Sequence, residues 1–202
     1  KIILIFDECT SGFRRNIGGM HLLSNINPDI VMLGKAIGNG YAITSVVGNK
    51  KIMKKAENSF ISSTMWSERV GFVAALATIN EMERIKSYKI LINRGRYLNK
   101  KWSELSKKYN LNLSINGIES ITSFQFPKHN QLYKTFISQE MLKKGFLSSN
   151  LIYLSTKHSI KIIDKYLYHL EKVFSKIKNT PINKIKKLLK GSISQNTFKR
   201  LN

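Results

Sequence analysis

Two short apolar runs, each followed by a charged side chain, constrain the fold of this 202-residue chain most strongly. One run, Ile30–Leu33, leads directly into Gly34 and Lys35, and the other, residues 2–6, ends in Asp7. A short apolar run bounded by such residues is typical of a buried strand that ends in a loop. In open α/β sheets, ligands bind outside the carboxyl ends of the strands. We therefore expect Asp7 and Lys35 to face one crevice from neighbouring strands.

An aspartate and a lysine in this arrangement match the requirements of pyridoxal phosphate. Burial lowers the pKa of an amine, and a neutral amine is a nucleophile that can form a Schiff base. The lysine would hold the aldehyde of the cofactor, and the aspartate would pair with the pyridinium nitrogen and keep the ring an electron sink. For Lys35 taken alone, a surface lysine after a strand is the better interpretation, because the chain is rich in lysine.

Three sequence blocks, in the same order as in a known family, extend this pattern. They are LIFDECTSGFR at residues 4–14, PDIVMLGKAIGNGYAI at residues 28–43 and SSTMW at residues 62–66. With these blocks the chain resembles the class III pyridoxal-phosphate-dependent aminotransferases, and it is most similar to the glutamate-1-semialdehyde 2,1-aminomutase-like group. The resemblance implies an α/β fold of fold type I. The chain would hold the latter part of the large mixed or parallel-sheet domain and a small α+β carboxyl-terminal domain.

The resemblance also implies roles for three residues. Lys35 would be the catalytic residue that carries the cofactor and then shuttles a proton as general base and acid. Asp7 would hold the pyridinium proton. Thr64 would bind the cofactor phosphate of the neighbouring subunit in a homodimer, and a phosphate site just before a helix is physically favourable. A plain helix-capping hydroxyl is the alternative for Thr64.

Three further residues are candidates on weaker grounds. Cys9 stands where the family often has a small apolar residue near the cofactor ring, and a free cysteine is similar in character. Arg14 is suited to pair with a substrate carboxylate, although a structural salt bridge is an equal alternative. Trp66 lies where many members have a different turn, so it is a candidate for the substrate pocket and leaves the substrate open.

The pattern predicts three parts of the chain. Residues 1–109 would belong to the cofactor-binding domain, residues 110–178 to the small domain, and residues 179–202 to a basic tail. Family members are considerably longer, and their glycine/serine phosphate loop and the aromatic residue that stacks on the cofactor ring lie in an earlier segment. Neither is recognisable here, so we expect the isolated chain to be weakly active or inactive. Whether the chain is a truncated relative or part of a larger protein stays open.

Periodicity predicts the main elements. Residues 70–79 are apolar on nearly every face, which predicts a helix buried against the sheet. Further helices are expected at residues 89–109 and 131–144 and along the apolar stripe of residues 160–174. Strands are expected at residues 43–47, 121–126 and 151–154, and residues 110–116 are interpreted as a polar break.

Charge and composition give a rival interpretation. The formal net charge is +22, and from Lys176 onward the chain has eight basic and no acidic residues. Such a tail can bind nucleic acid or an anionic membrane surface, which would make the chain a non-catalytic binding protein. That interpretation leaves Asp7, Lys35 and Thr64 unexplained. We therefore expect no specific nucleic acid or membrane partner, and a tail that folds back on the protein.

Cysteine and histidine usage supports an enzyme without a metal in a reducing compartment. Cys9 is the single cysteine, so no internal disulfide can form and a cytoplasmic location is expected. The four histidines have no partners at metal-ligand spacing. The expected substrates are an amino donor and a carbonyl acceptor. An aminotransferase and an aminomutase use the same imine chemistry, so the sequence does not choose between them.

Overall fold

The computed structural model describes residues 2–62 and 67–195, and it divides after Ile90 into two compact units. Helix α3 (Ser87–Lys108) begins in the first unit and continues into the second. The predicted boundary after residue 109 places this helix in the first part of the chain, and that division of domains stays a prediction. No helix of the described residues is both long and apolar enough to cross a membrane.

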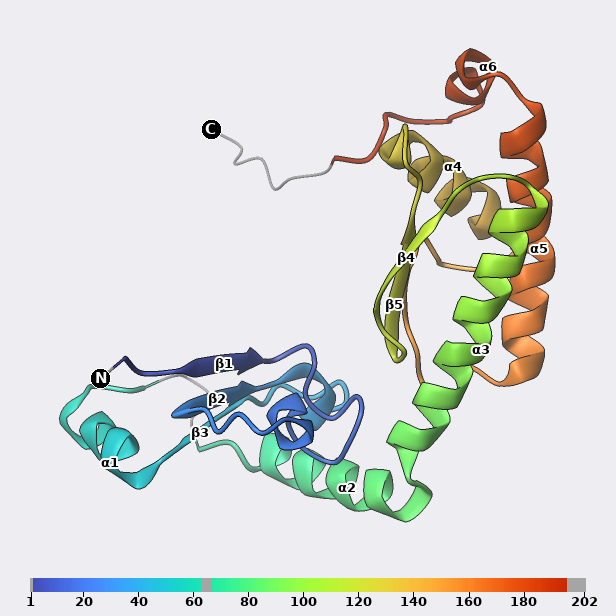
Figure 1. Cartoon of the computed structure of the whole chain (residues 1–202). Coiled ribbons are helices and arrows are strands. Elements are labelled where there is room, and N and C mark those ends of the chain that lie inside the picture. Colours follow the sequence, from blue (N-terminus) through green and yellow to red (C-terminus); the bar gives the residue numbers. More distant parts are fainter. Residues whose placement is uncertain (1, 63–66, 196–202) are drawn as a thin grey trace. The chain divides into compact units, whose positions relative to one another are not determined.

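The first unit contains a mixed three-stranded sheet (Figure 1). Strand β1 (Ile5–Glu8) pairs in parallel with β2 (Ile30–Leu33), and β2 pairs antiparallel with β3 (Ser45–Gly48). The predicted strand at 43–47 is thus confirmed with a small shift of its bounds. Because β1 and β2 are parallel, their carboxyl ends lie at the same edge of the sheet.

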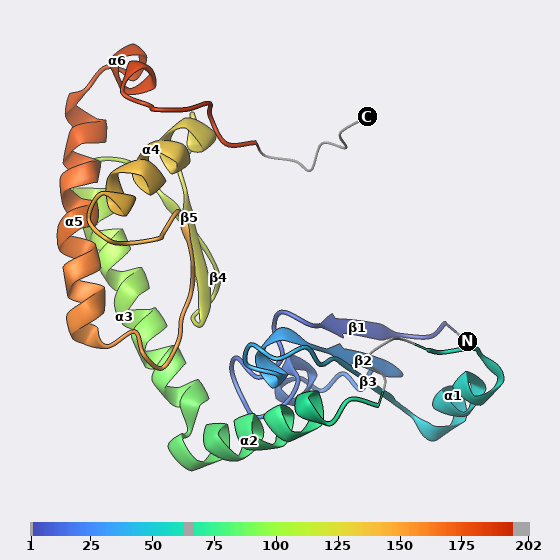
Figure 2. The same ribbon diagram turned by 180° about the vertical axis from the view of Figure 1, so that it is seen from behind.

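Short helical turns and one long helix complete this unit. The 3-10 turns are Met20–Leu23, Lys35–Ile37 and Lys54–Asn58, and a single α-helical turn, α1 (Lys50–Met53), precedes the last of them. Helix α2 (Arg69–Ile85) runs beside the sheet in both views (Figures 1 and 2).

Two expectations of burial in this unit are wrong. On α2, only Gly71 and Ala75 are buried, while the side chains of Val73 and Leu76 are each 64% exposed. The helix packs along one face on Phe13 and Ile37, and its opposite apolar face has no covering element among the described residues. The first apolar run is not buried either, because residues 2–5 are all exposed.

The second unit packs helices on an antiparallel sheet of order β4-β5-β6. Its strands are β4 (Ser114–Ile118), β5 (Ile121–Gln125) and β6 (Leu151–Tyr153), and its helices besides α3 are α4 (Asn130–Leu142), α5 (Ile160–Asn179) and α6 (Ile182–Lys187). The predicted helices and the strands at 121–126 and 151–154 are confirmed within a few residues. The interpretation of residues 110–116 as a break is wrong in part, because β4 begins at Ser114.

Aromatic rings fill the centre of this unit. Phe124 is fully buried and meets Trp102 and Phe174 edge-on, at centroid distances of 4.8 Å and 5.6 Å. Each edge-to-face pair contributes about 0.5–1.5 kcal/mol beyond its area burial. Trp102 comes from α3, Phe124 from β5 and Phe174 from α5, so one cluster joins three elements.

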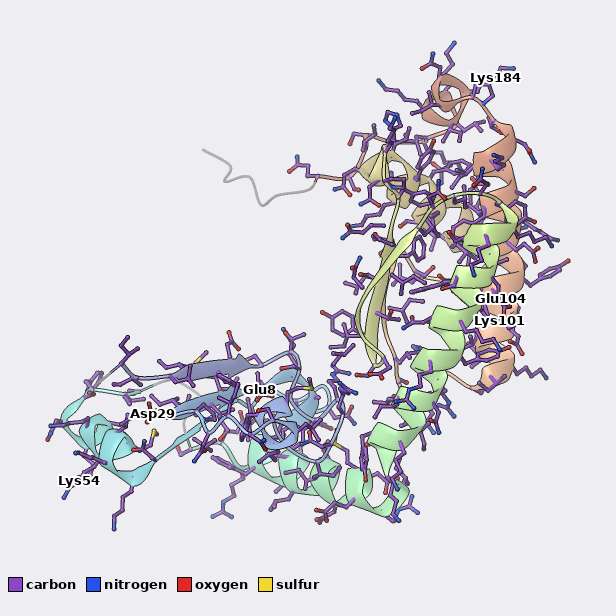
Figure 3. All side chains as sticks on the ribbon, viewed as in Figure 1. Glu8, Asp29, Lys54, Lys101, Glu104 and Lys184 are labelled. Atoms are coloured by element: carbon purple, nitrogen blue, oxygen red, sulfur yellow. The ribbon has the colours of Figure 1, made fainter. Side chains whose placement is uncertain are left out.

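The basic tail folds back on the second unit as far as it is described, as predicted. Ile185 of α6 is fully buried in the core. Gln139 on α4 donates to the Leu188 carbonyl at 2.9 Å and accepts from the Lys190 N–H at 2.7 Å. The hydroxyl of Thr135 accepts from the Ser194 N–H at 3.0 Å. Side chains such as Lys184 extend outward from this segment (Figure 3).

Candidate active site

The edge where β1 and β2 end brings the two main candidate residues together. Asp7 is opposite Met32 in the register of the parallel pair, and Lys35 follows β2 after Gly34. Both charged groups therefore leave the sheet from its carboxyl edge. This is the arrangement that the sequence predicts for a ligand site, with both side chains exposed at the edge.

Contacts of the loop after β1 join the two residues. The Cys9 N–H donates to Asp7 Oδ1 at 3.1 Å, and Lys35 Nζ donates to Thr10 Oγ1. Burial raises the pKa of the Cys9 thiol, and the hydrogen bond and charge of Asp7 act in the same direction, while Lys35 opposes them. Cys9 is therefore protonated at neutral pH and serves as a small, weakly polar wall beside both charges.

The backbone around Lys35 has two local constraints. Lys35 itself has a φ of 44°, in the left-handed region that residues with a Cβ adopt rarely. A Cβ at Gly34 would lie 3.4 Å from Cys9 Sγ and 3.5 Å from Thr44 Cγ2, so the chain passes close to the loop there. The strand, the turn and the Cys9 loop thus fix where the lysine stem leaves the sheet.

Glu8, next to Asp7, holds the loop that returns from β1. It is only 3% exposed and accepts hydrogen bonds from the His21 N–H at 2.9 Å, from His21 Nδ1 at 2.8 Å and from the Met20 N–H. Burial alone would raise the pKa of this carboxyl, but the hydrogen bonds from His21 and Met20 outweigh it and hold the pKa below its ordinary value. Glu8 is labelled beside the sheet in Figure 3.

Sequence reasoning assigned no role to Glu8 or Thr10. For Glu8 the available signal was a second carboxylate next to Asp7 at the end of the first apolar run. A further signal was Gly19, which permits the close turn that brings His21 to Glu8. A Cβ at Gly19 would lie 2.3 Å from His21 Nδ1 and 2.9 Å from Glu8 Oε1. For Thr10 no signal was available, because its contact with Lys35 joins residues that are far apart in sequence.

The other candidates lie in different parts of the chain. Arg14 is half-buried in the loop that follows β1, within the same unit. Thr64 and Trp66 lie outside the described residues. A pocket of about 530 Å³ in this unit is lined by Asp29, Val31 and Asn49, and it lies at the opposite end of β2, so its walls include neither Asp7 nor Lys35. Within the described ranges, no three His, Cys, Asp or Glu residues gather in a way that could hold a metal ion.

The residues at this edge are of the types that pyridoxal phosphate requires, an amine and a carboxylate. Asp7 lies in β1 and Lys35 lies in the turn that follows the neighbouring parallel strand β2, and the protonated Cys9 thiol interacts with both. One departure from expectation is that the Lys35 side chain is exposed and not buried. Covalent capture by an amine requires access, and this exposure provides it.

A comparison with models of known protein families shows the family to which the chain belongs. A family model described as aminotransferase class-III matches residues 1–177. The chain belongs to the class-III aminotransferase family. The resemblance seen in residues 4–14, 28–43 and 62–66 is thereby confirmed.

Curated members of the family are about a quarter to a third identical to this chain over the aligned residues. It is 34% identical over 134 residues to 3-aminobutyryl-CoA aminotransferase of Cloacimonas acidaminovorans (strain Evry), a match that covers 65% of this chain and 32% of that protein. It is 29% identical over 195 residues to glutamate-1-semialdehyde 2,1-aminomutase of Hyperthermus butylicus, covering 87% and 46%. The chain thus spans less than half the length of these class-III relatives.

Solved structures confirm the predicted fold. The structure of the PLP internal aldimine form of the Sphingopyxis sp. MTA144 FumI protein matches with a TM-score of 0.80 at 23% identity, over 86% of this chain and 42% of that one. An omega-transaminase from Sphaerobacter thermophilus matches with a TM-score of 0.78 at 18% identity, over 86% and 44%. This class-III chain therefore has the fold of the latter part of a fold-type-I transferase.

Proposed function

We propose that this chain forms part of a pyridoxal-phosphate enzyme that moves an amino group between an amino compound and a carbonyl compound. The observation that carries the proposal is the placement of Asp7 and Lys35 at the same edge of two adjacent parallel strands. Membership of the class-III family supports it. The related proteins named above include an aminotransferase and an aminomutase, so a glutamate-1-semialdehyde-type aminomutase is the alternative.

Lys35 is the proposed covalent attachment point and proton carrier. When bound, pyridoxal phosphate supplies an aldehyde that condenses with amines and a ring that accepts electrons. Lys35 Nζ would bind that aldehyde, and once displaced by the substrate amine it would take up and return a proton as general base and acid. The contact with Thr10 Oγ1 orients the amine at the sheet edge.

Asp7 and Cys9 are proposed to hold the opposite side of the cofactor ring. An ionised Asp7 carboxylate would accept a hydrogen bond from the protonated ring nitrogen and keep the proton there. The Cys9 N–H donates to Oδ1 of this carboxylate and helps to hold it at the sheet edge. The neutral Cys9 thiol would then contact the ring as a small apolar group.

Residues outside this cluster complete the proposal. Thr64 would bind the cofactor phosphate across the interface of a homodimer, and Arg14 and Trp66 would contribute to the substrate pocket. The compartment would be the cytoplasm, as the single cysteine indicates. Because the chain spans less than half the length of its relatives, we expect the isolated chain to have little or no turnover.

Borohydride trapping tests the cofactor site directly. The 202-residue chain is mixed with pyridoxal phosphate, its absorbance spectrum is recorded, and the adduct is reduced and mapped by peptide mass spectrometry. We expect an imine band and a label concentrated on Lys35. The variant Lys35→Ala should lose this band, while Lys51→Ala, which removes an exposed lysine on α1, should keep it.

Two outcomes would count against the proposal. A label spread evenly over exposed lysines, and unchanged in Lys35→Ala, would show that the chain does not recognise the cofactor at this edge. The same result in a form of the chain extended to the length of its class-III relatives would overturn the function itself. Full turnover by the isolated chain would refute the expectation of weak activity.

A further inference from the structure

The outer face of α5 carries a row of lysines around one exposed aromatic ring. The buried side chains of this helix, among them Ile163, Leu170 and Ile177, pack in the core of the second unit. On the opposite side of the helix, four lysines and a tyrosine recur at spacings of three and four residues, and all five are exposed. We call this set the α5 basic stripe, and its members are Lys161, Lys165, Tyr168, Lys172 and Lys176. The stripe extends for about 22 Å along the helix axis.

Carboxylates do not neutralise most of the α5 basic stripe. Within the described ranges, its first three lysines form no ion pair with Asp or Glu, and Lys176 at its end lies 3.6 Å from Glu140. Two other carboxylates of α5 are held by side chains of α3. Asp164 accepts a hydrogen bond from an α3 tyrosine hydroxyl at 2.6 Å, and Glu171 pairs with Lys108 at 2.6 Å. The stripe therefore keeps most of its positive charge for an external partner.

The lysines of the stripe lie close enough together to repel one another. Like charges four residues apart on a helix are destabilising, and both Lys161 with Lys165 and Lys172 with Lys176 have this spacing. Burial lowers the pKa of the neighbouring His169, and the charges of Lys144, Lys172 and Lys165 lower it further. This face of α5 thus disfavours an additional positive charge. A polyanion bound along the stripe would relieve the repulsion.

Tyr168 adds a feature that charge alone does not provide. Its ring is 57% exposed at the centre of the stripe, and Lys172 Nζ lies 4.1 Å from the ring centroid. An exposed ring among cations can stack a nucleic-acid base while the cations contact the phosphates. A helix that binds a bilayer instead inserts its apolar face into the lipid, and the apolar stripe of α5 is buried in the core. The combination therefore favours nucleic acid over a membrane surface.

We propose that the α5 basic stripe binds a strand of nucleic acid without sequence preference, with phosphates on the lysines and one base stacked on Tyr168. Its length of about 22 Å corresponds to about six successive phosphates at the spacing of about 3.4 Å along one strand. Helix α6 follows the carboxyl end of α5 and adds further exposed lysines, among them Lys184 (Figure 3). This activity goes beyond the proposed function, because the stripe belongs to the second unit, whereas Asp7 and Lys35 belong to the first.

Fluorescence anisotropy with a labelled oligothymidine of about 20 nucleotides tests the proposal on the 202-residue chain. The expected dissociation constant at 100 mM NaCl is about 1–100 μM, the range of non-specific binding. Four phosphate contacts predict that affinity falls about fiftyfold between 50 and 200 mM NaCl. The test uses no pyridoxal phosphate, so its outcome is independent of the proposed cofactor site.

Two triple variants of equal net charge separate the stripe from the total charge of the chain. The first neutralises three lysines of the stripe, as Lys161→Gln, Lys165→Gln and Lys172→Gln. It should bind about a hundredfold more weakly at 100 mM NaCl, and its affinity should fall only about threefold between 50 and 200 mM. The control neutralises three exposed lysines of the first unit and should change the affinity by about twofold or less. Its substitutions are Lys51→Gln, Lys54→Gln and Lys55→Gln.

Substitutions of tyrosine test the stacked base. Tyr168→Ala should weaken binding by about fivefold to a hundredfold, because the stacking platform is lost. Tyr168→Phe keeps the ring and should bind as the unaltered chain does. Tyr41→Ala removes a tyrosine of similar exposure (60%) in the first unit and should have no effect.

Several results would overturn the proposal. One is the absence of saturable binding at 100 mM NaCl, and another is equal weakening by the two triple variants, which would assign any binding to total charge. Tighter binding to phosphatidylserine vesicles than to the oligonucleotide would assign the stripe to a membrane surface. An unchanged affinity in Tyr168→Ala would refute the stacked base.

Discussion

Among the described residues, the hydrophobic core cluster of the first unit has three buried members, Phe13, Ile37 and Ala75, whereas that of the second unit has eighteen. The first unit carries the proposed active site and leaves apolar side chains of β1 and α2 in water. The second carries no proposed catalytic group and encloses its rings. Since buried apolar area is the main stabilising term, we expect the second unit to be the more stable one. Chemistry and stability are thus assigned to different parts of the chain.

The largest expected effect comes from a matched pair of phenylalanine truncations. Phe174→Ala in the second unit should lower the free energy of unfolding by about 3–5 kcal/mol, because a fully buried ring is lost and a cavity remains. Phe72→Ala on α2, where the ring is 57% exposed, should change it by about 0.5 kcal/mol or less. Urea unfolding followed by circular dichroism measures both. A cost at Phe72 as large as that at Phe174 would mean that α2 is covered in solution.

The next largest effect compares two carboxylates, one in each unit. Glu8→Gln should destabilise the first unit by about 1–3 kcal/mol, because the buried amide cannot accept all the hydrogen bonds from Met20 and His21. Glu171→Gln weakens a pair with Lys108 (2.6 Å) in which the side chains are 62% (Lys108) and 32% (Glu171) exposed, and about 0–1 kcal/mol is expected. Hydrogen exchange at the Met20 and His21 amides reports the first change. Equal effects at the two sites would contradict the difference in burial.

The pH dependence of Glu8 sharpens the same comparison. Its pKa in the folded chain is below the ordinary value of 4.5, so the unfolded state binds a proton first as the pH falls. The stability that Glu8 contributes is therefore complete above about pH 4.5 and is lost as the pH falls through the lower, folded pKa. Exchange rates at the Met20 amide, measured from pH 6 to pH 3 and corrected for intrinsic rates, should show this loss. The variant Glu8→Gln lacks this carboxyl, so its corrected exchange rates at the Met20 amide should not show the same loss between pH 6 and pH 3.

The smallest effect concerns the orientation of Lys35. Thr10→Val keeps the shape of the side chain and removes the oxygen that accepts from Lys35 Nζ. The selectivity of pyridoxal phosphate labelling for Lys35 over other lysines should fall by about twofold to tenfold, the range of one hydrogen bond. Peptide mapping after borohydride reduction measures this ratio. Unchanged selectivity would show that the strand and turn alone position the amine.

Sequence reasoning works best where one stretch determines its own structure. The strand before Lys35 is such a case, because four apolar residues are followed directly by glycine. The apolar stripe of α5 is another, since its spacing of three and four residues fits only a helix with one covered face. Both the strand and the helix are present where they were expected.

The wrong or missing predictions concern features that depend on contacts between segments far apart in the sequence. An apolar surface on α2 predicts burial, but burial also requires a partner element, and the sequence of a helix does not contain its partner. Strand β4 was missed although Ser114 and Asn116 alternate with apolar residues, because asparagine and Gly117 are typical of a loop and the pairing partner β5 is not visible in the run itself. The contact between Thr10 and Lys35 depends on how two loops meet, which local pattern does not encode.

The buried Ile185 has a consequence for the way the chain is made. This side chain belongs to the core that begins with Leu91, and a ribosome that adds about 5–20 residues per second needs about 5–20 seconds to travel from one to the other. During that interval the partly made second unit lacks a core residue, and its aromatic surfaces are open to chaperones and to neighbouring nascent chains. The Asp7 and Lys35 segments emerge earlier, so the sheet that presents them must persist through this interval with little core of its own.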